Sequence, residues 1–286
     1  MNRALIGVIG GSGLYRLDGL QNPREEVVET PFGPTSDSLR FGELNDVPLV
    51  FLARHGQGHR LLPSEVPYRA NIYALKAVGV RYVISVSAVG SLVAEIAPRH
   101  VVVPNQFIDL TKHRQSTFFG DGVVAHVSMA APISSAVASA LVHAHGQHAD
   151  PAQCHANGTY LCIEGPQFSS LAESLHYQAL GASVIGMTNM PEAKLAREAQ
   201  IAYATLALVT DYDCWHPHEA NVEAASALEN MAYNVALAQR IVATAATGLG
   251  TETPACEAHT ALAAAVVTPD VALNARQRGL LDILRR

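Results

Sequence analysis

The chain has 286 residues and a formal net charge of −6, with 49% hydrophobic and 15% charged residues. This composition excludes a disordered chain, and the balance of 19 basic against 25 acidic residues argues against a non-specific nucleic-acid binder. The sequence contains no run of about 18 apolar residues, the length that a transmembrane helix needs.

The four cysteines, at positions 154, 162, 214 and 256, contain no CxxC pair and are too sparse for a disulfide framework. We expect reduced thiols, which are typical of cytoplasmic proteins. The short apolar stretch at the start of the chain does not have the pattern of a signal peptide. The sequence therefore predicts a cytoplasmic location.

Apolar runs without polar alternation recur along the chain. They predict strands that are covered on both faces, because such strands have no solvent-facing side. The predicted strands span residues 4–10, 48–53, 82–86, 101–104, 183–187 and 202–209. Helical patterns lie between and after them, at residues 68–78, 132–149, 170–180, 191–199, 219–247 and 271–286. Pro132 and Pro191 suit a first helical turn, where the missing N–H has no cost.

This alternation predicts an α/β fold in which helices flank a central mixed β-sheet. The sequence has no internal repeat and no low-complexity linker, so we expect a single domain over residues 1–286. Residues 248–286 begin with the loosest part of the chain. We expect a loop there, followed by a helix that could close a site.

A glycine-rich segment, Gly10-Gly11-Ser12-Gly13, directly follows the first predicted strand. Glycine lets the backbone approach an anion closely, and successive N–H groups can bind phosphate oxygens. The segment lacks the last glycine of the dinucleotide motif G-x-G-x-x-G, and it lacks the lysine of a Walker loop. It is therefore a candidate phosphate site outside both standard motifs, with a structural turn as the alternative.

Arg54 and His55 directly follow the second predicted strand. Both can donate hydrogen bonds to an oxyanion, and the planar guanidinium of arginine suits phosphate. His55 and His59 have the spacing of metal ligands on a helix, but Gly56 and Gly58 disfavour a helix there. We therefore predict an anion-binding pair and no metal site, with a surface pair of no function as the alternative.

Two further segments supply polar groups near strand ends. Residues 85–91, SVSAVGS, would expose hydroxyl and N–H groups at the carboxyl edge of the sheet, where open α/β sheets bind ligands. In residues 163–170, IEGPQFSS, Phe168 could lie beside a flat ligand, while Ser169 or Ser170 suits the N-cap of the next helix. Ordinary turn chemistry is the alternative for both segments.

Asp211 and Asp213 follow the last predicted strand, in VTDYDCW, and give the sharpest chemical signal. In an extended chain, residues two apart point to the same side. Neighbouring carboxylates resist joint ionisation, so one of them can hold a proton near neutral pH. Such a pair can donate to a purine N7 and accept from an exocyclic amine. An Asp-rich turn is the alternative.

Taken together and in this order, the motifs resemble those of the trimeric purine nucleoside phosphorylase family, and within it the members that act on 5′-methylthioadenosine. The resemblance covers nearly the whole chain, through GGSGLY, ETPFGPTSD, FLARHGQGH, VPYRANIYALK, NQFIDLT, IEGPQFSS, GMTNMPEAKLAREA and VTDYDCW. It implies a homotrimer with sites shared between subunits. It also implies that phosphate is a co-substrate and that no metal or organic cofactor is needed.

The resemblance assigns roles to residues of this chain. The phosphate-binding residues that it implies are Ser12, Arg54, His55, Ser87, the amide of Ala88, and Thr188. The residues that it implies around the nucleoside are Met187 under the ribose, and Phe168, Asp211, Tyr212 and Asp213 at the base.

Finer roles follow from the same resemblance. Asp211 would serve the purine N7 and Asp213 the 6-amino side, with Ser169 holding Asp211 in place. His126 would face the 5′ substituent across a subunit boundary. The residues expected to line the alkylthio pocket are Val222, Ala224 and Ala227.

The implied activity is reversible phosphorolysis of 5′-methylthioadenosine to adenine and 5-methylthioribose 1-phosphate, a pentosyl transfer of purine and methionine salvage. Asp211 would act as the general acid toward the leaving base. Three alternatives stay open: a 6-oxopurine nucleoside or methylthioinosine as the substrate, a nucleosidase that does not use phosphate, and a non-catalytic nucleotide-binding module.

Overall fold

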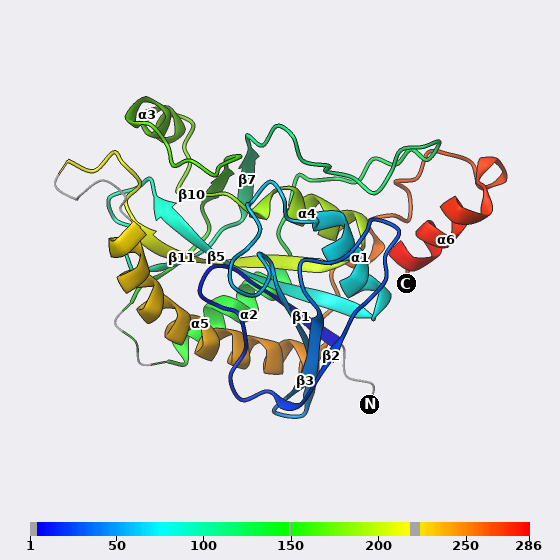
Figure 1. Ribbon diagram of the computed structural model, residues 1–286, viewed down its shortest axis with the longest axis horizontal. Coiled ribbons are helices and arrows are strands. Elements are labelled where there is room, and N and C mark those ends of the chain that lie inside the picture. The colour runs from blue at the N-terminus through cyan, green and yellow to red at the C-terminus, as the bar shows by residue number, and fades with distance from the viewer. Residues whose placement is uncertain (1–4, 149, 151, 218–223) are drawn as a thin grey trace.

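The computed structural model describes residues 5–148, 150, 152–217 and 224–286, and these form one mixed sheet of eleven strands. The central strand is β5 (Val80–Ser91), which pairs with β1 (Leu5–Gly10), β10 (Val184–Gly186) and β11 (Ala202–Asp211). Helices cover both faces of the sheet (Figure 1). The predicted fold, a single α/β domain with helices on both sides of a central mixed sheet, is confirmed.

One edge of β5 changes its partner along its length. Strand β1 pairs with this edge in parallel as far as Ser85, whereas β10 pairs with it in the antiparallel direction at Gly90 and Ser91. The opposite edge pairs in parallel with β11 as far as Gly90. The segment between Ser85 and Gly90 therefore lies at a topological switch, the place where α/β sheets commonly bind ligands.

The other strands extend the sheet on both sides of β5. They are β2 (Gln21–Glu26), β3 (Leu39–Leu44), β4 (Val47–Ala53), β6 (Val101–Val103), β7 (Gln106–Asp109), β8 (Cys154–Ala156) and β9 (Thr159–Cys162). Strand β4 pairs in parallel with β1, and β3 and β2 follow in antiparallel order. Beyond β5 the sheet divides into two branches, β10–β9–β7 and β11–β6–β8.

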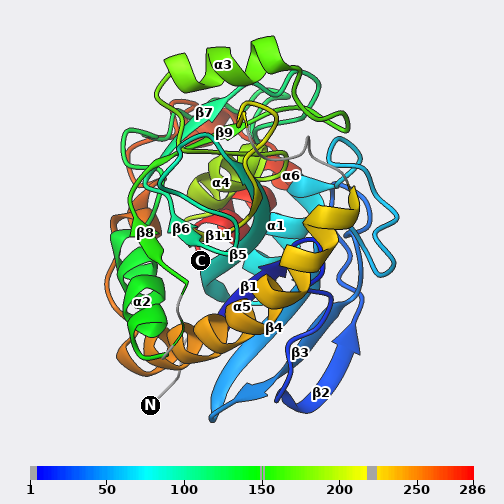
Figure 2. The same ribbon diagram turned by 90° about the vertical axis from the view of Figure 1, so that its left-hand side faces the viewer.

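Apart from α3, which lies away from the others at the top of Figure 2, the described helices form two layers. They are α1 (Tyr68–Ala77), α2 (Ser135–Gly146), α3 (Leu171–Ala179), α4 (Asn189–Glu198), α5 (Ala224–Glu252) and α6 (Ala275–Leu284). Helices α2 and α5 pack together on one face, and α1 and α4 pack on the other, with α6 outside α1. Within the described ranges, no helix combines the length and the apolar character needed to span a bilayer.

The predicted helices are confirmed in type, but several ends differ. Helix α2 begins after Ser134, whose hydroxyl accepts the Val137 N–H, so Pro132 lies outside it and not in its first turn. Pro191 does begin the regular part of α4, because Met190 before it has φ −115° and ψ 130°. Helix α5 continues past the predicted end at 247, and the last helix begins later than predicted.

The sequence pattern misses five strands: β2, β3, β7, β8 and β9. Strand β2 has the sequence QNPREE and is exposed along its whole length, so it carries no apolar signal. Strands β7, β8 and β9 have only three or four residues each, too few for a periodic pattern. All six strands that the sequence does predict are present, because their buried residues are continuous and apolar.

The C-terminal segment packs far from the carboxyl ends of the central strands. Lys76 Nζ in α1 donates to the carbonyl of Arg286, and the Gln200 side chain accepts the Leu262 N–H. Tyr82 also donates to the carbonyl of Pro254. These contacts fix the segment against α1 and the start of β11 within its own chain.

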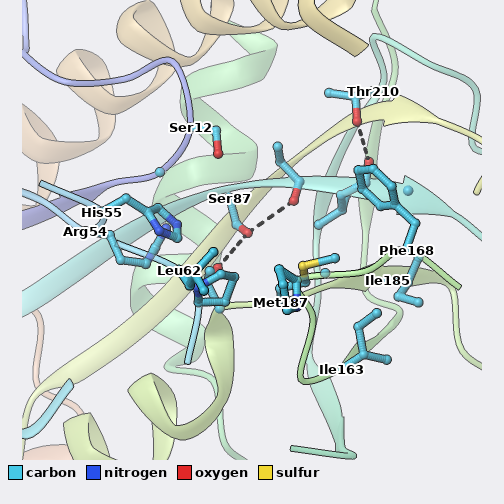
Figure 3. A pocket seen from close by; sticks show the side chains of 18 of the residues that line it. Ser12, Arg54, His55, Leu62, Ser87, Ile163, Phe168, Ile185, Met187 and Thr210 are labelled. Atoms are coloured by element: carbon cyan, nitrogen blue, oxygen red, sulfur yellow. Dashed lines mark hydrogen bonds between the residues drawn. The ribbon is translucent and has the colours of Figure 1, made fainter. Parts of the chain in front are cut away.

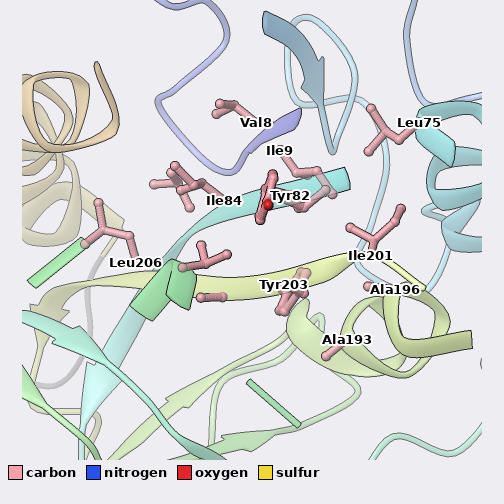
Figure 4. Close-up of a cluster of buried hydrophobic side chains, with 14 of the residues drawn as sticks. Val8, Ile9, Leu75, Tyr82, Ile84, Ala193, Ala196, Ile201, Tyr203 and Leu206 are labelled. Atoms are coloured by element: carbon pink, nitrogen blue, oxygen red, sulfur yellow. The ribbon is translucent and has the colours of Figure 1, made fainter. Parts of the chain in front are cut away.

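The core lies between the sheet and the two helix layers (Figure 4). Ile84 on β5 is fully buried, and its partner in register on the neighbouring β11 is the buried Ala204. A buried aliphatic side chain at the centre of such a sheet contributes both its transfer free energy and the tight packing around it.

We expect Ile84→Ala to lower the free energy of unfolding by about 2–5 kcal/mol, because it removes buried methyl groups and leaves a cavity. Val271→Ala is the matched control, since Val271 is 92% exposed and its truncation should change the value by no more than about 0.5 kcal/mol. Urea unfolding of both variants measures the difference. Equal losses in the two variants would contradict the placement of Ile84.

Candidate active site

A cavity of about 370 Å³ lies at the carboxyl ends of β1 and β4, beside the segment of β5 at the topological switch. Its lining comes from several stretches of the chain: Gly11 and Ser12; Arg54 and His55; residues 59–63; residues 87–90; Ile163, Pro166, Phe168 and Ser169; residues 185–188; Thr210, Asp211 and Asp213; and Met231. Figure 3 shows Ser12, Arg54 and His55 toward one end, and Phe168 and Thr210 toward the other.

At the first end, the Arg54 guanidinium is fully buried and forms an ion pair with Glu192 of α4. Its Nε lies 2.8 Å from Glu192 Oε2, and its Nη2 lies 3.0 Å from Glu192 Oε1. Nη2 also donates to Ser85 Oγ at 2.6 Å, and Nη1 donates to the carbonyl of Val86 at 2.9 Å. Burial lowers the pKa of Arg54, but the Glu192 carboxylate outweighs it and holds the pKa above its usual value.

These contacts use four of the five N–H groups of the guanidinium. In the described part of the chain, one N–H of Nη1 is left for a ligand. A Cβ at Gly11 would lie only 2.9 Å from Nη1 and 2.5 Å from the Val86 carbonyl, so the glycine-rich segment passes directly over Arg54. The two segments predicted to bind phosphate therefore lie together. Arg54, however, has fewer N–H groups left for a ligand than its side chain alone would offer.

His55 is buried beside Arg54 and is neutral near pH 7. Its pKa is lowered to about 4, mainly because burial and the Arg54 charge disfavour the protonated ring. Nδ1 lies 2.8 Å from the carbonyl of Leu61, which can only accept, so the single proton of the ring is on Nδ1. Nε2 therefore has no proton and can only accept a hydrogen bond. This corrects the expectation that His55 donates a hydrogen bond to an oxyanion.

Hydroxyl groups complete this end of the cavity. Ser87 Oγ lies 3.2 Å from Thr188 Oγ1, and both residues line the cavity together with Ser12 and Ala88. Thr188 precedes α4 but makes no cap hydrogen bond with its side chain, so its hydroxyl is available to the cavity. All six residues that the resemblance assigns to phosphate lie at this cavity.

At the other end, Asp211 accepts from the Thr210 hydroxyl at 2.7 Å and from the Asp213 N–H at 2.9 Å. Burial raises the pKa of Asp211, while these two hydrogen bonds oppose the rise. Gly90 gives the carboxylate room, because a Cβ there would lie 2.8 Å from Asp211 Oδ1. The expected contact from Ser169 to Asp211 is not formed, and Thr210 takes that place.

Asp213 reaches the cavity by a tight turn and not by an extended chain. Its φ is 52°, in the left-handed region, and its N–H closes an Asx-type turn onto Asp211. Asp213 Oδ2 and Ser169 Oγ are both buried, and neither has a hydrogen-bond partner within the described ranges. Both residues line the cavity, so an acceptor and a hydroxyl are left for a polar ligand.

The remaining predicted residues separate into three groups. Met187 and Phe168 line the cavity, and Phe168 lies at its rim with 59% of its surface exposed. Tyr212 and His126 do not line it in their own chain: Tyr212 donates to the carbonyl of Ala94, and His126 is exposed. Val222 lies outside the described residues, and the side chains of Ala224 and Ala227 in α5 are likewise not described.

Two buried residues behind the cavity are missed by the sequence reasoning. Glu192 holds Arg54, and Arg114 donates to the backbone carbonyls of Met187, Met190 and Glu164. Arg114 thereby fixes two loops that form one wall. No local sequence pattern distinguishes either residue, because Arg114 lies in the polar stretch TKHRQST and Glu192 in NMPEAK, where a charge does not indicate a partner.

Residues after 248 contribute nothing to the cavity lining of their own chain. Their role in closing a site stays a prediction. The described residues contain no group of three or more His, Cys, Asp or Glu side chains arranged to hold a metal ion.

The arrangement suits a ligand with an anionic part and a flat polar heterocycle. Hydroxyl and N–H donors lie at one end, two acidic side chains lie at the other, and the apolar Met187 lies between them. Preoriented donors in a site that excludes water stabilise charge strongly. A nucleoside and a phosphate ion together match this distribution.

Residues 5–247 match the family model of the phosphorylase superfamily. The chain is 52% identical over 267 residues to S-methyl-5′-thioadenosine phosphorylase of Thermosynechococcus vestitus, covering 93% of this chain and 92% of the relative. A methylthioadenosine phosphorylase crystal structure from an Antarctic soil metagenomic library superposes with a TM-score of 0.93, at 57% identity and 99% coverage of both chains.

A more distant structure is similar over most of the fold. Methylthioadenosine phosphorylase from Schistosoma mansoni, in complex with adenine, has a TM-score of 0.80 at 36% identity, covering 87% of this chain and 93% of that one. On its sequence, its fold and the residues that meet in its cavity, this chain belongs to the phosphorylase superfamily.

Proposed function

We propose that the protein catalyses the reversible phosphorolysis of S-methyl-5′-thioadenosine to adenine and S-methyl-5-thioribose 1-phosphate. The observation that carries the proposal is one cavity with anion donors at one end and two acidic side chains at the other. Relatives with more than half of their residues identical are named for this activity. Phosphate would be the only co-substrate, without a metal or organic cofactor.

The phosphate end would supply the nucleophile. The free N–H of Arg54 and the hydroxyls of Ser12 and Thr188 would bind phosphate oxygens, and His55 Nε2 would accept the proton of a singly protonated phosphate. As the bond from C1′ to the base lengthens, positive charge develops on the sugar. The bound anion stabilises that charge and attacks C1′, so no covalent enzyme intermediate is required.

The acidic end would accept the leaving base. Burial moves the pKa of Asp211 upward, toward the range in which a carboxyl can hold a proton for N7. Asp213 Oδ2 would accept from the 6-amino group of adenine. A 6-oxo group presents an acceptor there and would leave a buried polar pair unsatisfied, at a cost of about 1–3 kcal/mol.

We further propose a homotrimer in which His126 completes a neighbour's site. The exposure of His126 and its position outside the cavity of its own chain support this arrangement. We also place the protein in the cytoplasm, because its four cysteines are free thiols, as expected in a reducing compartment.

Initial rates on methylthioadenosine, adenosine, inosine and methylthioinosine, with and without phosphate, test the reaction. We expect phosphate-dependent release of adenine from methylthioadenosine. Asp211→Asn should lower kcat by about 10²–10⁴-fold, because the general acid is lost. Asp18→Asn, the same change at an exposed side chain, should keep wild-type rates. Release of base without phosphate, faster turnover of inosine, or normal kcat in Asp211→Asn would each overturn the assignment.

His55 gives a prediction for the pH dependence of stability. Its pKa falls from an ordinary 6.5 to about 4 in the folded protein, so the unfolded chain takes up this proton first on acidification. The free energy of unfolding should therefore decrease between pH 6.5 and pH 4, by about 3 kcal/mol from this residue. His55→Asn keeps a donor to Leu61 but cannot titrate, so its stability should fall less steeply. Denaturant unfolding at several pH values measures this difference. If the free energy of unfolding falls equally with pH in the wild type and in His55→Asn, the burial of a neutral His55 is contradicted.

Subunit mixing tests the shared site. His126→Ala and Asp211→Asn should each be poorly active alone. When the two are unfolded together and refolded, some mixed trimers would combine an intact His126 with an intact Asp211 across one boundary and regain activity. Light scattering should give three times the monomer mass. A monomeric mass, or no recovery in mixtures that do form mixed oligomers, would refute the shared site.

A further inference from the structure

A further hydroxyl group lies behind the phosphate end of the cavity. Tyr160 on β9 is fully buried and is not part of the cavity lining. Its hydroxyl oxygen lies 3.1 Å from Ser87 Oγ, which in turn lies 3.2 Å from Thr188 Oγ1. The three hydroxyls therefore form a chain that starts in the protein interior and ends at the cavity.

Gly186 makes this position of Tyr160 possible. Strand β10 runs parallel to β9, with Gly186 opposite Cys162. A Cβ at Gly186 would lie 1.9 Å from the Tyr160 hydroxyl oxygen and 2.5 Å from its Cζ. The φ of Gly186 is not in the left-handed region, so space and not backbone conformation requires a glycine here. The phenol fills the volume that any side chain at 186 would occupy.

Either hydroxyl of each pair can donate, and one consistent arrangement begins with the buried phenol as the donor. Burial raises the pKa of Tyr160, so the phenol keeps its proton. Each hydroxyl has one hydrogen to donate. If Tyr160 donates to Ser87, the single Ser87 hydrogen can go to Thr188 at 3.2 Å or to the carbonyl of Ala88 at 3.4 Å. When it goes to Thr188, the hydrogen of Thr188 is left for an anion. The dipoles of such a chain reinforce one another.

We propose that Tyr160, seated in the space that Gly186 leaves, is a positioning residue that directs the hydroxyls of Ser87 and Thr188 toward bound phosphate. This inference rests on the proposed phosphorolysis, because it assigns phosphate to this end of the cavity. Without the phenol, Ser87 Oγ loses its donor from the interior, and the hydroxyl of Thr188 is free to turn toward Ser87. One donor to the anion is then no longer fixed.

Tyr160→Phe tests the proposal, since it removes only the hydroxyl. We expect KM for phosphate to rise by about three- to tenfold, the effect of one neutral hydrogen bond, while KM for the nucleoside and kcat at saturating phosphate change by less than about twofold. Calorimetric titration with inorganic phosphate should show the same loss of affinity. Tyr82→Phe is the matched control, because its buried ring also carries one hydroxyl, which donates to the carbonyl of Pro254 outside the cavity.

An unchanged KM and affinity for phosphate in Tyr160→Phe would overturn the inference. So would an equal rise of the phosphate KM in Tyr82→Phe, or an equal rise of the phosphate and nucleoside KM in Tyr160→Phe. Failure of the proposed function gives a different result: the wild-type enzyme itself would release base without phosphate.

A second set of variants tests the contact with Gly186. Gly186→Ala should lower the melting temperature in the wild-type background, because its methyl group overlaps the phenol. The same change in a Tyr160→Leu background should have little further effect, since the shorter side chain leaves the volume empty. An equal decrease in both backgrounds would show that Tyr160 does not occupy this space.

Discussion

The buried ion pair between Arg54 and Glu192 is the interaction on which the phosphate end of the cavity depends. A fully buried guanidinium is stable only when its charge and its N–H groups are satisfied, since desolvation costs several kcal/mol per ion. Glu192 supplies the charge, and Ser85 and the Val86 carbonyl supply further acceptors. Because these partners come from α4 and β5, the pair fixes the end of β4 relative to both elements.

The same pair determines how the cavity can bind an anion. The positive charge of Arg54 is offset by Glu192, and His55 beside it is neutral. This end therefore holds fixed dipoles, N–H and O–H groups, in place of a strong net charge. Such groups need no reorganisation during the reaction. A phosphate held in this way also keeps its own negative charge available to an electron-poor sugar.

The acidic end is built by the opposite principle, since the acidic groups there are left partly unsatisfied. Strand β11 carries Asp211 to the edge of the sheet, and the tight turn after it brings Asp213 back to the same space. Burial shifts the pKa of Asp211 upward, and no cationic side chain among the described residues pairs with it. Glu192, by comparison, forms an ion pair with Arg54. The two acidic groups at the cavity and the Glu192 carboxylate behind it thus differ in their partners.

The sequence by itself determined the central strands and the residues that follow them, because continuous apolar runs specify buried strands, and the carboxyl ends of parallel strands meet at one edge. This edge placed Ser87 where α/β sheets bind ligands, and the family resemblance assigned Arg54 and Asp211 to the same site. Only the tertiary structure decided which partners these groups have. Glu192 and Tyr160 are distant in sequence from the residues that they hold, and no local pattern encodes a pairing made by packing. For the same reason the protonation of His55, which depends on burial and on Arg54, follows from the folded state alone.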